Sequence, residues 1–343
     1  MAQIDYPAIL DEAWQQHLAP RADDAPTVIS TFAGCGGSSL GYSMAGFREL
    51  LAVEWNDNAV ATFKLNFPDV PVYHGDIAKL SVDECLQLAG IEPGQLDVLD
   101  GSPPCQGFST AGKRQLDDPR NQLAMEFVRL LRGLQPKAFI MENVSGLVKG
   151  KMKLVFAEIM RELKASGYKV KCRLMNAMYF QVPQSRQRLI WVGVRKDLGI
   201  EPGHLAGQGG PITAGQAMRN VPEYMMPFIP SRESKSGYLL HNLEQGQKAT
   251  ELIGTRFGTV RIDETRPFPT VAKGAYAEAG FSHLIHPSLL RSLSIGELRR
   301  AGAFPDNFVF AGKYTDAHPL IGNSVPPLFM RAIAQHVRGL LTV

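Results

Sequence analysis

The chain has 343 residues, of which 45% are hydrophobic and 20% charged, and its formal net charge is +3. This composition excludes a disordered or fibrous chain and fits a large globular domain with a smaller one. No apolar run reaches the ~20 residues that span a bilayer, so we expect an intracellular, soluble protein with no membrane partner. The four cysteines show no zinc-ligand spacing, which predicts no metal site and a reducing compartment, the cytoplasm.

Apolar segments of strand length alternate with helical patterns between residues 27 and 194, which predicts an α/β fold. Beyond Lys196, up to about Leu290, glycine, proline and turn residues replace this rhythm and predict a second, smaller, irregular domain. Predicted strands cover 27–32, 50–53, 70–73, 96–100, 138–141, 168–176 and 189–194. Predicted helices cover 58–66, 82–88, 121–134, 154–166, 295–301 and 328–341, and Leu10, Trp14 and Leu18 at helical spacing predict one more near the N-terminus.

A glycine-rich turn follows the first predicted strand, with Gly34, Gly36 and Gly37 around Cys35. Glycines at a strand-to-helix turn let main-chain amides approach a ligand closely. Ser39 stands where a nicotinamide-type G-x-G-x-x-G pattern has its third glycine, so the pattern is F-x-G-x-G-G instead. A tight turn without a ligand is the alternative interpretation.

Two acidic residues follow the next two strands. Glu54 lies about 20 residues beyond the glycine turn, where doubly wound folds bind a ribose hydroxyl. The neighbouring Trp55 can flank a purine, and Asp76 can accept from an adenine amino group. With no Gly-Lys-Ser/Thr phosphate motif, the set predicts a nucleoside-containing cofactor, although a solvated acid at a strand end is the alternative for Glu54.

Cys105 follows the strand 96–100 and two prolines, Pro103 and Pro104, which end any sheet ladder. This places the thiol on a stiff bend beyond a strand's carboxyl end, where ligands bind in open α/β sheets. Taken alone, the position fits a buried small hydrophobe as well as a reactive thiol.

Glu142 ends another apolar strand, so a second acid lies at the same edge of the predicted sheet. Further on, Arg186 and Arg188 alternate around Gln187, which turns both guanidiniums to one face of an extended chain. Such a face invites an anionic or carbonyl-rich ligand. A structural glutamate and ordinary paired surface arginines are the alternatives.

The order of these motifs resembles the cytosine-5 DNA methyltransferase family along nearly the whole chain. The matching stretches are Phe32-Ala33-Gly34-Cys35-Gly36-Gly37, Glu54-Trp55, Gly75-Asp76-Ile77, Pro103-Pro104-Cys105-Gln106, Glu142-Asn143-Val144, Gln184-Ser185-Arg186-Gln187-Arg188 and Gly322-Asn323-Ser324-Val325-Pro326-Pro327. The resemblance implies a Rossmann-like, S-adenosylmethionine-dependent methyltransferase fold with a smaller, irregular target-recognition domain. It also implies a large catalytic and cofactor-binding domain over 1–195, target recognition by 196–293, and a segment 294–343 that returns to the large domain.

The same resemblance implies roles for individual residues. Cys105 would add to C6 of a flipped-out cytosine, so that C5 becomes nucleophilic enough to take the methyl group. Glu142 would hold the N3 edge, and Arg186 and Arg188 would support the O2 oxygen. S-adenosyl-L-methionine would be held by Phe32, Gly34, Cys35, Gly36, Gly37, Glu54, Trp55, Asp76, Ile77, Pro104, Leu123, Asn323 and Val325.

We therefore expect a bacterial, nucleoid-associated DNA (cytosine-5-)-methyltransferase. Its partners would be double-stranded DNA and, in a restriction-modification system, a cognate restriction endonuclease, and it would be a monomer. Two alternatives stay open, a tRNA cytosine-5 methyltransferase and a catalytically silent nucleic-acid-binding paralogue. The family's Arg-Glu-x-x-Arg-x-Gln-x-Phe-Pro block is changed here, because Gly296 replaces its first Arg and Gly302 its Gln.

Overall fold

The computed structural model describes residues 4–104, 122–254, 258–273 and 280–342, which form two compact units. The first, which we call the sheet unit, contains Gln16–Asn176, Gln187–Ala206 and the residues from Met330 on. The second, the irregular unit, contains the residues up to Gln15, Ala177–Arg186 and Gly207–Phe329. Each unit is therefore assembled from separate stretches of the chain.

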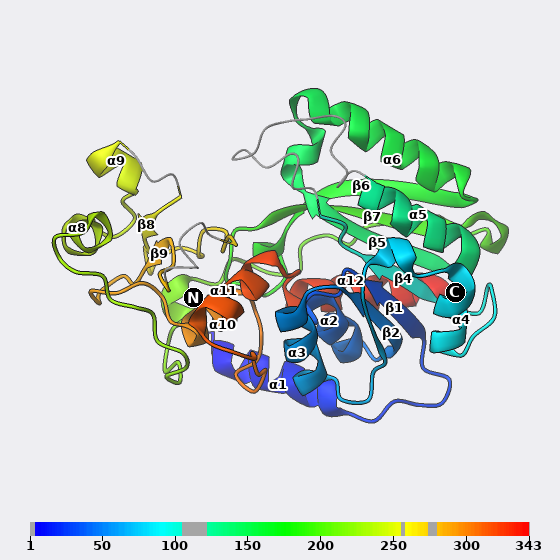
Figure 1. The fold of residues 1–343 in the computed structure, drawn as a ribbon, viewed down its shortest axis with the longest axis horizontal. Coiled ribbons are helices and arrows are strands. Elements are labelled where there is room, and N and C mark those ends of the chain that lie inside the picture. Colours follow the sequence, from blue (N-terminus) through cyan, green and yellow to red (C-terminus); the bar gives the residue numbers. More distant parts are fainter. Residues whose placement is uncertain (1–3, 105–121, 255–257, 274–279, 343) are drawn as a thin grey trace. The chain divides into compact units, whose positions relative to one another are not determined.

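The sheet unit is built on a seven-stranded sheet in the order β3-β2-β1-β4-β5-β7-β6 (Figure 1). Its first five strands in that order run parallel, and β7 runs antiparallel to both β5 and β6. The strands are β1 (Thr27–Thr31), β2 (Arg48–Glu54), β3 (Val72–His74), β4 (Val98–Gly101), β5 (Ala138–Val144), β6 (Tyr168–Asn176) and β7 (Gln187–Arg195). The predicted α/β architecture is confirmed.

Helices cover both faces of this sheet (Figure 1). On one face, α4 (Val82–Ala89), α5 (Gln122–Leu134) and α6 (Lys153–Ala165) enclose a core in which Phe127 of α5 meets Phe139 of β5 at 5.9 Å between ring centroids. The other face carries α2 (Gly37–Met44) and the larger part of α12 (Pro327–Leu341). There Arg338 donates to the carbonyl oxygen of Ala45 at 3.0 Å and so joins α12 to the end of α2. The helix α3 (Asp57–Asn66) follows β2 and is capped by Asn56.

The helices and strands of the irregular unit are short, as predicted from the end of the strand-helix alternation after Lys196. They are α7 (Ala214–Ala217), α8 (Lys235–Asn242), α9 (Ala249–Ile253), β8 (Val260–Arg261), β9 (Leu284–Ile285), α10 (Ile295–Ala301) and α11 (Tyr314–Asn323). The helix α1 (Tyr6–Leu18) begins in this unit and α12 begins at its end. A local core forms where Leu239, Leu240 and Leu243 of α8 and its end pack with Phe281 and Ile285.

The two glycines that depart from the family's block lie in and just after α10. A Cβ at Gly296 would lie 2.7 Å from the carbonyl oxygen of Pro222, so the main chain passes too close for a side chain there. At Gly302 the nearest atom, in Ile321, would be 3.1 Å away, which is also tight. The block's glutamate, Glu297, keeps an ion pair with Arg291 at 2.7 Å. The neighbouring atoms thus leave little room for a side chain at either Gly296 or Gly302, so the packing of the irregular unit fits glycine at both positions.

The predicted elements of the sheet unit match the structure to within a few residues. The first strand, for example, ends at Thr31, and the predicted helix 121–134 appears as α5. The assignment of 196–293 to target recognition stays a prediction, and we note that the irregular unit also includes Ala177–Arg186 and part of the C-terminal segment.

Candidate active site

The carboxyl ends of β1 to β5 lie at one edge of the sheet, because these five strands are parallel. From β1 the chain continues to β2 and β3 on one side, while β4 and β5 lie on the other. This reversal between β1 and β4 is a topological switch point, where open α/β sheets bind ligands. The edge brings together the glycine turn, Glu54, Asp76, Pro103 and Glu142.

The carboxylate of Glu54 accepts hydrogen bonds from the main chain of the glycine turn and of the residues that follow β2. One carboxylate oxygen, Oε2, accepts from the main-chain N–H of Gly34 at 2.8 Å. The other, Oε1, accepts from the N–H groups of Trp55 and Asn56, both at 2.9 Å. These bonds use three of the four lone-pair sites of the carboxylate, so Oε2 keeps one site that can accept from a ribose hydroxyl.

The surroundings of the turn leave room for a nucleoside. A Cβ at Gly34 would meet no atom within 4 Å in the described part of the chain. Trp55 is 75% exposed, so its indole is available for stacking. Asp76 is exposed and accepts from Ala78 N–H at 3.0 Å through one oxygen, and Ile77 is buried beside it. These residues fit S-adenosylmethionine, which has a ribose and a purine but no phosphate.

Glu142 and Arg188 form an ion pair at this edge. Arg188 Nε donates to Glu142 Oε1 at 2.7 Å, and both side chains are nearly buried, at 13% and 10% exposure. The pairing follows from the register, because β5 and β7 place Val144 opposite Arg188 and so put Glu142 diagonally next to it on the same face. The result is a carboxylate and a guanidinium held side by side.

Asn143 joins this ion pair to the segment that leads to Cys105. Its Nδ2 donates to the carbonyl oxygen of Pro103 at 3.1 Å, and its Oδ1 accepts from Val144 N–H at 2.8 Å. The side chain is 4% exposed. Sequence reasoning quoted Asn143 only within a motif and missed this contact. Cys105 itself lies outside the described residues, and Pro104 is the last residue described before it.

Arg186 belongs to the irregular unit and is 2% exposed. Its guanidinium donates to the carbonyl oxygens of Val271 at 3.1 Å and Gly322 at 3.0 Å. At least two of its N–H groups are thus engaged by main-chain carbonyl oxygens. A role of Arg186 toward cytosine stays a prediction. Two further predicted cofactor residues, Asn323 and Val325, lie in the same unit, whereas Leu123 lies in α5 and Cys35 is buried in the glycine turn.

A buried acidic pair lies beneath the glycine turn, and sequence reasoning missed it. Asp100 accepts from the hydroxyl of Tyr42 at 3.2 Å, and Glu49 accepts from that of Ser39 at 2.9 Å. Burial raises the pKa of Asp100 to about 8, with Glu49 and Glu142 adding to the rise, and burial raises the pKa of Glu49 to about 7. The signal in the sequence was an acid inside an otherwise apolar strand.

Asp100→Asn should make the stability of the protein less dependent on pH. Folded Asp100 keeps a proton that the unfolded chain releases near pH 4, so the free energy of unfolding falls as pH rises from about 4 to about 8. Urea unfolding at about pH 5 and about pH 9 measures this fall, which should be smaller in the variant. Exposed Glu158 supplies the control, Glu158→Gln, and an equal fall in all three proteins would contradict the expectation.

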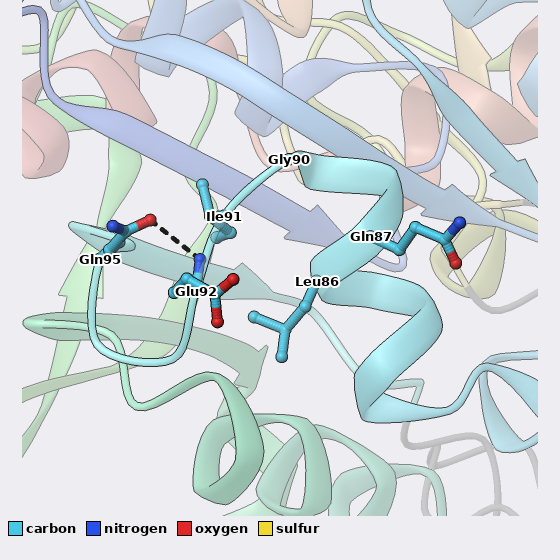
Figure 2. Close-up of a pocket in the computed structure, with 6 residues that line it drawn as sticks. All are labelled: Leu86, Gln87, Gly90, Ile91, Glu92 and Gln95. Atoms are coloured by element: carbon cyan, nitrogen blue, oxygen red, sulfur yellow. Dashed lines mark hydrogen bonds between the residues drawn. The ribbon is translucent and has the colours of Figure 1, made fainter.

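A hollow of about 200 Å³ lies away from this edge. Figure 2 shows the six residues that line it. It is found where α4 ends and the chain leads toward the amino end of β4. Glu92 N–H donates to Gln95 Oε1 across it at 2.8 Å. Its lining consists of Leu86, Gln87, Gly90, Ile91, Glu92 and Gln95, none of which the chemistry above requires.

Comparisons with known proteins show which family the chain resembles. The model of the C-5 cytosine-specific DNA methylase family matches residues 26–338. The chain is 36% identical to the type II methyltransferase M1.HphI of Haemophilus parahaemolyticus over 91% of this chain and 86% of that protein. It is 32% identical to the type II methyltransferase M.XorII of Xanthomonas oryzae pv. oryzae over 91% and 84% of the two chains.

A solved structure extends the likeness to the fold. It is that of a prophage-encoded protein of Escherichia coli assigned as a DNA modification methyltransferase, with a TM-score of 0.77 and 25% identity over 93% of this chain and all of that one. Within the described residues, no helix is long and apolar enough to cross a membrane. The chain therefore belongs to the C-5 cytosine-specific DNA methylase family, enzymes that methylate carbon 5 of cytosine in DNA with S-adenosylmethionine as the methyl donor.

Proposed function

We propose that this enzyme methylates a cytosine that it flips out of the DNA duplex, through a covalent bond between Cys105 and C6 of the base. The observation that carries the proposal is the Glu142–Arg188 ion pair at the same sheet edge as Pro103, tied to that residue by Asn143. A base placed at this edge would meet an acid for its N3 side, a cation for its O2 oxygen and the segment that bears the thiol. Carbon 5 is unreachable inside a stacked duplex, which is why flipping is part of the proposal.

The chemical steps assign one task to each residue. The Cys105 thiolate adds to C6 while Glu142 shares a proton with N3, and the electron pair reaches C5. S-adenosylmethionine supplies the electrophilic methyl group for C5. A base then removes the C5 proton, the bond from C6 to sulfur breaks, and Cys105 leaves as thiolate. Arg188 stabilises the negative charge that develops on O2.

The proposed binding partners follow the same reasoning. Glu54, Trp55 and Asp76 would hold the nucleoside part of the cofactor, and residues 196–293 would read the DNA sequence. The similarity to type II methyltransferases supports a restriction-modification role with a cognate endonuclease in a bacterial cytoplasm. We propose a monomer.

Expression in a bacterial host without DNA methylation tests the proposal. Bisulfite sequencing of the host genome should find 5-methylcytosine in one short sequence context. Expression of the Cys105→Ser variant controls for background conversion. An unmethylated genome, with the wild-type chain present in the soluble fraction, would contradict the proposal and direct the search to tRNA.

A further inference from the structure

The edge strand β6 carries a row of cations on one face. Side chains alternate along a strand, so Lys169, Lys171 and Arg173 share a face, while Val170 and Cys172 turn to the core beneath α6. We call these three residues the β6 basic row. Lys171 and Arg173 are exposed.

The β6 basic row lies on the same face of the sheet as the Glu142–Arg188 pair. Residues directly opposite each other in neighbouring strands share a face, and Ile190 of β7 is opposite both Glu142 and Arg173. Glu142 and Arg173 therefore occupy one row across the sheet, two strands apart. With strands about 4.8 Å apart, their main chains are separated by roughly 10 Å. Ile190 between them is buried, so the long side chain of Arg173 would meet a phosphate beyond the nucleotide held at Glu142.

The charge of this row is only partly neutralised. Lys169 binds Glu201 at 2.6 Å, but within the described residues neither Lys171 nor Arg173 forms an ion pair. His204 lies beside them, with its Nε2 2.8 Å from the carbonyl oxygen of Ile190. Burial lowers the pKa of His204, and Arg173 and Lys171 lower it further. Glu201 also interacts with Lys171, but in the described part of the chain the β6 basic row still carries more positive charge than this one acid offsets.

We propose that Lys171 and Arg173 bind backbone phosphates of the DNA strand that carries the target cytosine, next to the flipped nucleotide. The inference rests on the proposed function, which places that nucleotide at Glu142. Phosphates fix the position of the strand without reading sequence. Two exposed cations on the same edge strand would hold neighbouring phosphates on one side of the extruded base. Lys169, already paired with Glu201, is not part of the contact.

The test is the salt dependence of DNA binding by Lys171→Gln, Arg173→Gln and the double variant. Each lost phosphate contact should lower the slope of log Kd against log salt by about 0.9. The slope of the double variant should therefore be about 1.8 lower than that of the wild type. Its binding at low salt should be weaker, and the loss of affinity should be equal for cognate and unrelated duplexes. The control for each single variant is Lys64→Gln, because Lys64 is also exposed, lies toward the end of α3 and loses the same single positive charge.

Fluorescence anisotropy with a labelled duplex gives the slopes, and calorimetry of S-adenosylmethionine binding reports on the fold. Slopes equal to those of wild type and Lys64→Gln would overturn the inference. If the wild type methylates cytosine while the slopes do not change, the proposed function stands and only this inference fails. If the slopes fall but the wild type transfers no methyl group to cytosine, the proposed function fails and phosphate binding stands.

Discussion

Cys105→Ser should abolish DNA methylation, with a loss of roughly 10⁴-fold or more, and should still bind S-adenosylmethionine. A serine hydroxyl is almost fully protonated at neutral pH and is a poor nucleophile, whereas a cysteine has a reactive thiolate fraction. The residues predicted to hold the cofactor are unchanged in the variant. Transfer of a radiolabelled methyl group to DNA and calorimetry of cofactor binding measure the two properties.

A duplex with 5-fluorocytosine at the target position separates a covalent role of Cys105 from a structural one. Fluorine cannot leave C5 as a proton does, so the wild type should remain attached to the DNA in a denaturing gel and Cys105→Ser should not. Cys172→Ser is the matched control, because burial raises the pKa of Cys172 to about 12 and keeps it a thiol. Full activity of Cys105→Ser, or trapping by that variant, would contradict the mechanism.

Glu142→Gln should lower kcat by about 10² to 10⁴ and change the affinity for the cofactor little. Glutamine keeps the shape of the side chain but cannot give a proton to N3. It also leaves Arg188 without the carboxylate that its Nε contacts at 2.7 Å, so the guanidinium is less firmly held. Steady-state kinetics on a short duplex measure the loss.

The exposed Glu158 of α6 again gives the control, since Glu158→Gln removes an acid far from the strand ends. Cofactor binding by Glu142→Gln shows that the sheet unit is folded. A kcat within about threefold of wild type would remove Glu142 from the proton-transfer step.

The sheet unit was largely predictable because its elements are local patterns. Apolar runs of strand length and helical periodicity are set by neighbouring residues, so β1, α5 and β5 appear close to their predicted bounds. Parallel strands end at a shared edge, so the positions of Glu54 and Glu142 at that edge also follow from the pattern.

The contacts that build the site were not predictable in the same way. Tyr42 and Asp100 are 58 residues apart, and Arg186 is 136 residues from the carbonyl group of Gly322 that it binds. No local period links such residues. The sequence predicted Arg186 and Arg188 on one face, but β7 begins only at Gln187, and Arg186 extends its guanidinium to main chain of the irregular unit.

The division of the chain into interleaved stretches decides how hybrid enzymes can be made. A fragment that carries only 196–293 would leave behind Gln184, whose amide accepts from Val271 N–H at 3.0 Å and donates to the carbonyl oxygen of Ala301 at 2.9 Å. If that fragment were moved between relatives to exchange sequence specificity, the Val271 position of the donor would therefore face the Gln184 position of the recipient. A hybrid with fusion points between residues 206 and 207 and between 329 and 330, and with Ala177–Arg186 from the same donor, keeps Gln184 together with Val271 and Ala301.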